Sequence, residues 1–376
     1  MKIAVNTRLF LPGRLEGIGW FMYENLSRIT RWHPEHWFYF IFDRKWDDSF
    51  VFGPNVEPVA VPPQARHPLL YYTWFEFSLP LLFRKIKPDL FFSPDGYLSL
   101  RTRVPSVNVF HDLNFEHYPK DLPWHECRYY RHFFPKYARK ALRIATVSEY
   151  SKQDIVKQYG VEPEKIDVVY NGANESFKPL TAEEKSAARQ KFTGGIPYFV
   201  FVGALHPRKN LVNLFKAFDL FRARYDQPFR LLIVGEKMWW TAQIRQAYQQ
   251  MKYRDEVIFS GRLDLKQLVN AVGAAEALTY VSYFEGFGIP IVEAFRTATP
   301  VITSGVTSMP EVAGDAALIT DPFSPDSIAG AMLQIARDPA TSEMLSERGL
   351  KRAELFTWDQ SAQRLWKTIE KALETK

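Results

Sequence analysis

The chain has 376 residues, of which 46% are apolar, and at roughly 100–200 residues per domain this length predicts two domains. Its 48 Lys and Arg against 42 Asp and Glu leave a net charge of +6, a surplus too small to indicate nucleic-acid binding. One cysteine excludes a disulfide scaffold and a cysteine-rich zinc site, and no apolar run reaches the ~18–20 residues of a membrane span. The first residues have the pattern of a strand rather than of a signal peptide, so we expect a cytoplasmic protein.

Short apolar runs alternate with longer helical patterns along the whole chain. Runs of Val, Ile and Phe without polar alternation indicate strands buried on both faces, and therefore parallel sheets covered by helices. The runs of the first half are Ile3–Asn6, Phe38–Phe42, Leu90–Ser93, Val107–Phe110, Ile144–Val147 and Ile166–Tyr170. After the polar stretch Lys178–Gly195 the series restarts with Tyr198–Gly203, Leu231–Gly235, Val257–Gly261, Ala277–Ser282, Val301–Ser304 and Ala316–Thr320.

This alternation predicts an α/β protein with two doubly wound, Rossmann-like domains. We expect an N-terminal domain over residues 1–175, a C-terminal domain over 176–356 and a closing helix over 357–376. The segment Trp358–Ala372 is amphipathic, with Leu365, Ile369 and Ala372 on one side, as a packed closing helix requires.

In open α/β sheets, ligands bind beyond the carboxyl ends of the strands. In the first half, Gly17 and Gly19 follow the first run, and His111, with Asp112 beside it, follows Val107–Phe110. A glycine turn at a helix N-terminus lets backbone N–H groups approach a phosphate, although the same pair is compatible with a tight turn alone. His111 likewise fits either a core histidine or a contact to a bound sugar.

The second half places cations, glutamates and glycines after its runs. Arg208 and Lys209 lie between an apolar strand and a helical run, where the pair can clamp a diphosphate. The N–H groups of Phe287–Ile289 open a second helix and would stabilise the same charge. The remaining candidates at these ends are Gly203, Gly235, Gly261, Glu285, Gly288 and Glu293.

The sequence lacks the motifs of several other classes of enzyme. There is no G-x-x-x-x-G-K-[ST] of an NTPase, no G-x-S-x-G nucleophile elbow and no H-E-x-x-H. No D-x-D offers a carboxylate pair for a metal-bound nucleotide, and Met22 stands where the G-x-G-x-x-G fingerprint needs its third glycine. We therefore expect a site with neither a metal nor a separate cofactor.

The segment from Glu285 to Glu293, E-G-F-G-I-P-I-V-E, resembles the signature of the retaining GT-B glycosyltransferases of family 4, the group 1 family. Three other segments are similar to sequences of the same family: F-V-G-A-L-H-P-R-K-N from Phe201, V-F-H-D-L from Val109 and S-M-P-E-V-A-G-D-A-A from Ser308. The resemblance covers essentially the whole chain. It implies two Rossmann-like domains facing a central cleft, a C-terminal helix that crosses back to the first domain, a nucleotide-diphosphate sugar donor, no metal, and retention of anomeric configuration.

The resemblance also implies roles for single residues. Lys209 and Arg208 would hold the diphosphate, Glu285 would contact the donor sugar and Glu293 the ribose hydroxyls. Ala204 stands where some members carry Arg, so Arg208 supplies that charge or the site has one cation fewer. The residues implied in catalysis are His111, Glu285 and Lys209, and those implied in donor binding are Gly17, Gly19, Gly203, Arg208, Lys209, Gly235, Gly261, Phe287, Gly288, Ile289 and Glu293.

Residues 124–143 form a basic segment in which Glu126 is the only acidic residue. His132, Lys136, Lys140 and Arg143 fall on one helical stripe, which fits either a solvated face over a core or a helix on an anionic membrane surface. The segment Leu69–Phe83 is a second candidate for lipid contact, or a buried helix. Peripheral attachment to the inner face of the cell membrane is therefore one expectation.

The flanks of His111 and Ser308 resemble bacterial mannosyltransferases of surface-polysaccharide assembly. GDP-mannose is therefore the first expected donor and a UDP-sugar the second, with a glycan or lipid-linked glycan as acceptor and no nucleic-acid partner. Two alternatives remain open: a non-catalytic sugar-nucleotide-binding protein, and a nucleotide-sugar epimerase on the same fold.

Overall fold

The computed structural model describes residues 1–13, 15–236 and 240–374. The chain divides into a first unit of Met1–Asn171 with Trp358–Lys376, and a second unit of Gly172–Thr357. The chain thus leaves the first unit four residues before the expected boundary at 175, and it returns at Trp358 rather than at 357.

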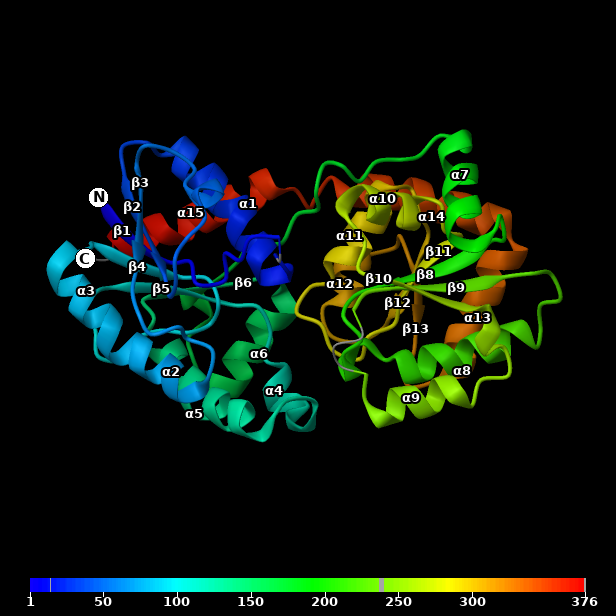
Figure 1. The fold of residues 1–376 in the computed structure, drawn as a ribbon, viewed down its shortest axis with the longest axis horizontal. Helices are drawn as coiled ribbons and strands as arrows, with labels where there is room; N and C mark the ends of the chain where they lie inside the picture. Colours follow the sequence, from blue (N-terminus) through cyan, green and yellow to red (C-terminus); the bar gives the residue numbers. More distant parts are fainter. Residues whose placement is uncertain (14, 237–239, 375–376) are drawn as a thin grey trace. The chain divides into compact units, whose positions relative to one another are not determined.

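The first unit is built on a parallel sheet of seven strands in the order β3-β2-β1-β4-β5-β6-β7 (Figure 1). Strand β1, the third in this order, pairs with a neighbour on each side, so that Ile3 lies opposite Phe38 and Leu90. The strands are β1 (Lys2–Asn6), β2 (Trp37–Phe42), β3 (Val56–Ala60), β4 (Leu90–Ser93), β5 (Ser106–Phe110), β6 (Arg143–Thr146) and β7 (Ile166–Val168).

Helices cover this sheet, and a large aromatic core that includes Trp74, Phe91, Phe110 and Tyr137 fills the space beneath one set of them. A π-helical turn, Trp74–Ser78, joins α2 to α3, so residues 68–86 run as one helical segment. The helices are α1 (Gly17–Trp32), α2 (Pro68–Thr73), α3 (Leu79–Ile86), α4 (Asn114–His117), α5 (Trp124–Lys140), α6 (Glu149–Tyr159) and α15 (Trp358–Glu374), and α15 packs against α1.

The second unit has a parallel sheet of six strands in the order β10-β9-β8-β11-β12-β13. The strands are β8 (Tyr198–Val202), β9 (Arg230–Val234), β10 (Val257–Gly261), β11 (Ala277–Tyr280), β12 (Val301–Ser304) and β13 (Leu318–Thr320). The helices are α7 (Ala182–Thr193), α8 (Leu211–Arg222), α9 (Ala242–Gln249), α10 (Leu265–Gly273), α11 (Ile289–Arg296), α12 (Met309–Ala313), α13 (Pro325–Arg337) and α14 (Pro339–Ala353).

Both sheets have the doubly wound order, in which the third, second and first strands are followed by the fourth, fifth and sixth. The expected pair of Rossmann-like α/β domains is therefore confirmed. The order reverses between β1 and β4 in the first unit and between β8 and β11 in the second. These two switch points are where such sheets bind ligands.

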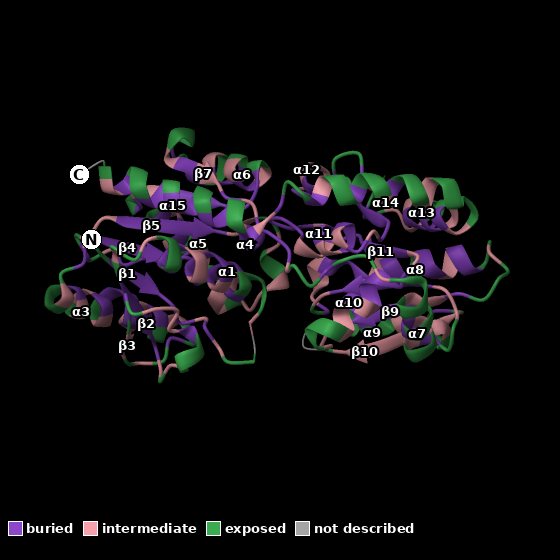
Figure 2. Cartoon of the chain, turned by 90° about the horizontal axis from the view of Figure 1, so that it is seen from above, coloured by how far each residue is buried: buried purple, intermediate pink, exposed green. Residues whose placement is uncertain are grey.

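The strands coincide with the predicted apolar runs because both faces of each sheet are covered, as the largely buried strands in Figure 2 show. Strand β3 was not predicted, because Glu57 and Pro58 break its apolar pattern and its place at the edge of the sheet tolerates them. In the described parts of the chain, no helix combines the length and the apolar character needed to cross a membrane.

Candidate active site

The switch point between β8 and β11 brings three charged side chains of the second unit together. Arg208 and Lys209 lie in the short 3-10 turn Pro207–Lys209 after β8, and Glu285 lies in the loop after β11. Arg208 Nη1 donates to Glu285 Oε2 over 2.5 Å, and Lys209 Nζ donates to Glu285 Oε1 over 2.7 Å. Each carboxylate oxygen therefore has its own cation.

Glu285 is ionised in this environment. Burial alone would raise its pKa, since the residue is only 4% exposed, but the charges of Arg208 and Lys209 and the hydrogen bond from Lys209 outweigh burial and lower the pKa to about 2. Two cations and one carboxylate leave a net charge of +1 at the switch point. Such a centre attracts an anion while its carboxylate stays fixed.

Two further residues position this group and were not predicted. Tyr280, the last residue of β11, accepts a 2.5 Å hydrogen bond from Lys209 Nζ, which also lies 4.7 Å from the centre of its ring. Ser308 Oγ donates to the carbonyl oxygens of Glu285 and Phe287 over 2.9 and 3.1 Å and so braces the loop. Tyr280 lies inside a predicted apolar strand, which gave no sign of a site residue. Ser308 lies in a segment that resembles the group 1 glycosyltransferase family.

The three expected glycines lie at the ends of neighbouring strands: Gly203 follows β8, Gly235 follows β9, and Gly261 is the last residue of β10. Gly203 N donates to Val234 O, and Gly235 N donates to Gly261 O. Gly235 has φ of +152°, and a Cβ there would lie 1.9 Å from Gly203 O, so only glycine fits. Gly203 and Gly235 thus allow close packing of the ends of β8 and β9 beside Lys209, whose Cε lies 3.5 Å from a Cβ placed on Gly203, whereas a Cβ on Gly261 would meet no atom within 4 Å.

Helix α11 starts after the loop that carries Glu285. Gly288 takes φ of +103° as its N-cap residue and Ile289 is the first helical residue, so the first backbone N–H of the helix follows Glu285 by four positions, and Pro290 after it has none. The ring of Phe287 is buried and contacts Phe356 at 5.5 Å between centroids. Phe287 thus contributes its backbone, not its ring, to the strand end.

Glu293 is the fifth residue of α11 and lies in the second turn of the helix, which begins at Ile289. Its side chain has no hydrogen-bond partner among the described residues. Burial raises its pKa to about 7, without any neighbouring charge to oppose the effect. Glu293 is therefore about half protonated at neutral pH, unlike Glu285.

The first unit holds the other predicted site residues. Gly17 opens α1, and neither Gly17 nor Gly19 has a positive φ, so the pair is not a strained turn. His111 follows β5, where its Nε2 donates to Pro94 O over 2.8 Å and Phe21 contacts its ring edge-on. Burial lowers the pKa of His111, so the imidazole is neutral with Nδ1 left as an acceptor.

Helix α5 has the basic face that the sequence predicts, with Lys136, Arg139 and Lys140 exposed. Arg143 was wrongly placed on its helical stripe, because the helix ends at Lys140 and Arg143 begins β6, where it pairs with Asp167 over 2.6 Å. On the other side of α5, Tyr129, Phe134 and Tyr137 pack into the core.

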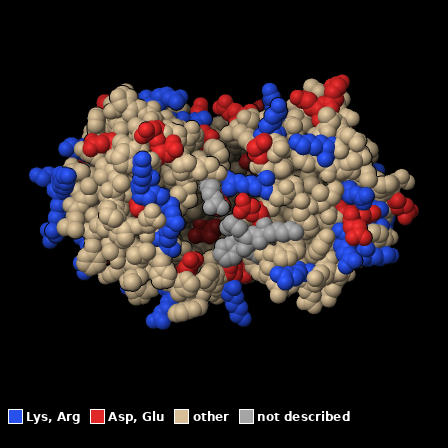
Figure 3. All heavy atoms as spheres, in the orientation of Figure 1, with Lys and Arg blue, Asp and Glu red and all other residues tan. Residues whose placement is uncertain are grey.

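The helical segment 68–86 lies beside α5 and keeps part of its apolar surface uncovered. Leu69 and Leu81 are 67% and 63% exposed, and Phe77 between them is exposed under the guanidinium of Arg101, 4.2 Å from the ring centre. Arg84 and Lys85 end this stripe, and Figure 3 shows basic side chains at that left edge of the first unit, over the α3 of Figure 1. The segment is therefore buried on one side only.

Known proteins match the chain in both halves. The family described as "Glycosyltransferase Family 4" matches residues 18–177, and the family described as "Glycosyl transferases group 1" matches residues 182–352. The O-antigen chain mannosyltransferase RfbU of Salmonella typhimurium is 30% identical over 77% of this chain and 77% of its own. O-antigen chain mannosyltransferase B of Escherichia coli is 29% identical over 73% of this chain and 72% of its own.

A solved structure supports the fold. Anabaena Alr3699/HepE in complex with UDP-glucose has a TM-score of 0.76 with this chain at 17% identity, covering 99% of this chain and 100% of its own. The first family match ends at residue 177 and the second begins at residue 182, close to the boundary between the two structural units at residues 171 and 172. Fold, motif and relatives agree, and the chain belongs to the group 1 glycosyltransferases of family 4 and is a glycosyltransferase.

Proposed function

We propose that this glycosyltransferase moves a hexosyl group, mannosyl in the first instance, from a nucleotide-diphosphate sugar to a glycan acceptor with retention of configuration and without a metal. The observation that carries the proposal is the paired cation centre at the β8–β11 switch point, where Arg208 and Lys209 converge on Glu285. The mannosyltransferase relatives support mannose, and the UDP-glucose complex of the Anabaena neighbour supports a UDP-sugar as the second candidate.

In this proposal the leaving diphosphate is stabilised by the protein's own charges. Negative charge grows on the diphosphate as the bond to the sugar breaks, and Arg208, Lys209 and the first N–H groups of α11 oppose it there. A preorganised centre of this kind needs no reorientation during the reaction. It supplies the electrostatic stabilisation that a divalent cation would otherwise give.

Glu285 is unsuited to covalent catalysis because both of its oxygens are bound to cations. A carboxylate held this way is a weak nucleophile, but its negative charge still stabilises a sugar ring that becomes positive. We therefore infer attack on the same face from which the diphosphate leaves. Retention follows from that geometry without a covalent glycosyl-enzyme intermediate.

Glu293 is assigned to the ribose of the donor, which does not react, and His111 keeps its expected place beside the donor sugar. A ribose that donates two hydroxyl hydrogens to Glu293 lowers its raised pKa and draws it into the carboxylate form. The free Nδ1 of neutral His111 accepts a hydrogen bond from a sugar hydroxyl. The ribose contact of Glu293 binds donor and transition state alike, whereas His111 contacts the sugar that reacts.

Kinetics of two matched variants test these assignments. Glu285→Gln should lower kcat by about 10²-fold or more, because it removes charge that acts only in the transition state. Glu293→Gln should mainly raise the donor KM. The assays compare GDP-mannose with UDP-glucose, follow nucleotide release, and determine the anomer of the product by NMR; an inverted product would refute same-face attack.

The same experiment separates the alternatives. A non-catalytic binding protein would bind nucleotides but release none in the presence of any glycan extract, and an epimerase would change the sugar without transferring it. Equal, small losses of stability in both glutamate variants with normal turnover would mean that the carboxylates only complement the start of α11, worth about 0.3–1 kcal/mol each.

We also propose that the first unit binds an anionic membrane surface on the inner face of the cell membrane, where a lipid-linked glycan would be presented. The support is the exposed apolar stripe of segment 68–86 beside the basic face of α5, with Trp124 74% exposed at the start of that helix. Apolar side chains enter the headgroup region of a bilayer while Lys and Arg pair with phosphates.

Charge reversal of Lys136, Arg139 and Lys140 should weaken binding to vesicles that contain an anionic lipid by at least about 100-fold, since each basic residue contributes about 1 kcal/mol. Hydrolysis of a soluble donor should not change. The matched control reverses Lys216, Lys252 and Lys266, exposed residues of the second unit. If the wild-type protein does not bind these vesicles even at low salt, the basic face of α5 is only a solvent-exposed surface and the membrane proposal is wrong.

A further inference from the structure

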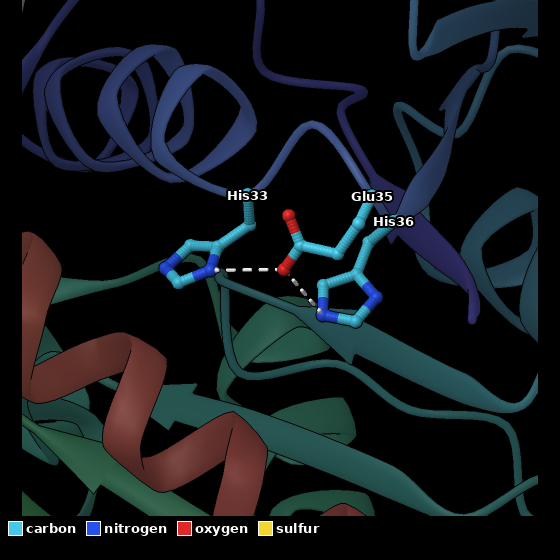
Figure 4. Close-up of side chains that lie close together, drawn as sticks. All are labelled: His33, Glu35 and His36. Atoms are coloured by element: carbon cyan, nitrogen blue, oxygen red, sulfur yellow. Dashed lines mark ion pairs between the residues drawn. The ribbon is translucent and has the colours of Figure 1, made fainter.

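Three potential metal ligands lie together in the first unit, in the turn between α1 and β2. His33 caps the C-terminus of α1, and Glu35 and His36 follow before β2 begins at Trp37 (Figure 4). This turn is at the amino end of β2, the opposite edge of the sheet from the carboxyl ends that carry His111. Nothing in the proposed transfer reaction uses these side chains.

The spacing of the ligand atoms suits a small cation. His33 Nδ1 lies 3.4 Å and His36 Nε2 lies 3.2 Å from Glu35 Oε1, and the ligand atoms all lie within 4.8 Å of one another. Ligands at about 2.0–2.2 Å from a tetrahedral ion are about 3.3–3.6 Å apart, so the two shorter distances already approach that geometry. Figure 4 shows both imidazoles turned toward the one carboxylate oxygen.

The scaffold holds both rings before an ion arrives. The ring of His33 stacks on Trp366 of α15 with centroids 3.8 Å apart and planes at 19°, and the ring of His36 lies 5.1 Å from the same indole. Trp366 is fixed in turn by its hydrogen bond to Glu370, 2.7 Å long. The ligands therefore lose little freedom on binding, which favours affinity.

One hydrogen bond of His36 would change on metal binding. Its Nδ1 lies 3.2 Å from the Met1 amino group. A metal ion binds the neutral ring, and an ion at Nε2 requires the proton of that ring to sit on Nδ1. The Met1 amino group must then give up or turn away its hydrogen bond.

We propose that His33, Glu35 and His36 bind a divalent transition-metal ion of the zinc type, with water in the remaining position, and that the ion secures the α1–β2 turn against α15. Two imidazole nitrogens and one carboxylate oxygen favour Zn²⁺, Ni²⁺ or Cu²⁺ over Mg²⁺ or Ca²⁺. Three protein ligands leave the ion exchangeable rather than permanently enclosed. The alternative is that Glu35 only forms ion pairs with the two histidines.

Trp366 provides a local test in the full-length protein. Titration with Cu²⁺ or Ni²⁺ should quench the Trp366 fluorescence with 1:1 stoichiometry, because the ion sits on a ring stacked on that indole. In Trp366→Phe the same titration should lose this quenching while calorimetry with Zn²⁺ still detects binding. Quenching that is unchanged in Trp366→Phe would place the ion elsewhere and overturn the proposal.

Variants of the ligands complete the test. His33→Ala and His36→Ala should each weaken Zn²⁺ binding at least tenfold, and Zn²⁺ should raise the melting temperature of the wild type but not of the double variant. The matched control is His67→Ala with His125→Ala, a stacked histidine pair of the same unit that no carboxylate joins in the described structure. Equal Zn²⁺ affinity in the wild type and the double variant, or no 1:1 binding by the wild type, refutes the site.

Discussion

At the scale of single residues, Glu285 and Glu293 differ in the charge around them, although both are glutamates of one motif. Glu285 lies between two cations, which lower its pKa to about 2, whereas Glu293 is buried without an opposing charge, which raises its pKa to about 7. The first carboxylate is a fixed charge of the folded protein. The second is only about half ionised at neutral pH unless a bound group donates hydrogen bonds to it.

Lys209→Ala should lower kcat/KM for the donor by about 30–1,000-fold, equivalent to about 2–4 kcal/mol, because it removes a charge-assisted contact that strengthens as the diphosphate leaves. Steady-state kinetics of nucleotide release measure the effect, and Lys216→Ala on the exposed side of α8 is the control. Unchanged kinetics in Lys209→Ala would remove this lysine from the site.

Glu293→Gln should stabilise the donor-free protein at pH 8 but not at pH 4.5. The unfolded chain ionises this residue near pH 4.5 and the folded chain near pH 7, so the native state loses stability as pH rises between these values. The difference amounts to at most about 3 kcal/mol, or roughly 6–12 °C in melting temperature. Thermal melts of the wild type and the variant at both pH values test this prediction, with Glu347→Gln on α14 as the control. A difference in melting temperature that does not depend on pH would contradict the assigned pKa.

The identity of the charged residues could be predicted from sequence, but their protonation could not. Arg208, Lys209 and Glu285 each follow an apolar run, so a ligand-binding edge was the expected place for them. Their mutual pairing depends on which strands are neighbours, and β8 and β11 are separated by 74 residues of chain. The contact of Tyr280 with Lys209 was hidden for the same reason.

At the scale of elements, the strand ends of the second unit depend on backbone contacts that no side chain can replace. Gly235 lies so close to Gly203 that β8 and β9 meet backbone to backbone at the edge that carries Lys209. Strand positions were predictable here because buried parallel strands are uniformly apolar. The ends of helices were harder to predict: α5 stops at Lys140, before Arg143, which was expected on its helical stripe.

Gly235→Ala should destabilise the second unit by more than about 3 kcal/mol, because its Cβ would overlap Gly203 O and no side chain there can turn away. Gly261→Ala is the matched comparison: its φ of +69° is unfavourable for alanine, but no atom lies within 4 Å of a Cβ, so a loss of about 1–2 kcal/mol is expected. Denaturant unfolding of both variants checks the ranking, which equal losses would contradict.

At the scale of the whole molecule, transfer activity should survive an excess of EDTA. The proposed site uses Arg208 and Lys209 where other sites use a metal ion. The cluster of His33, Glu35 and His36 lies at the opposite edge of the first unit's sheet from His111. EDTA should therefore lower the melting temperature of zinc-loaded protein and leave turnover unchanged. Loss of activity on chelation, restored by Mg²⁺ or Mn²⁺, would contradict the metal-free mechanism.

The first unit is interrupted in sequence, and this has a consequence for the order of events during synthesis. Helix α15 packs against α1, β5 and β6, yet residues 172–357 are made between it and the rest of its unit. At about 5–20 residues per second a ribosome needs roughly 10–40 s for that insertion. For this time the surface that will receive Leu365 and Ile369 stays open on the nascent chain, so the second unit, though later in sequence, is the first that can be completed.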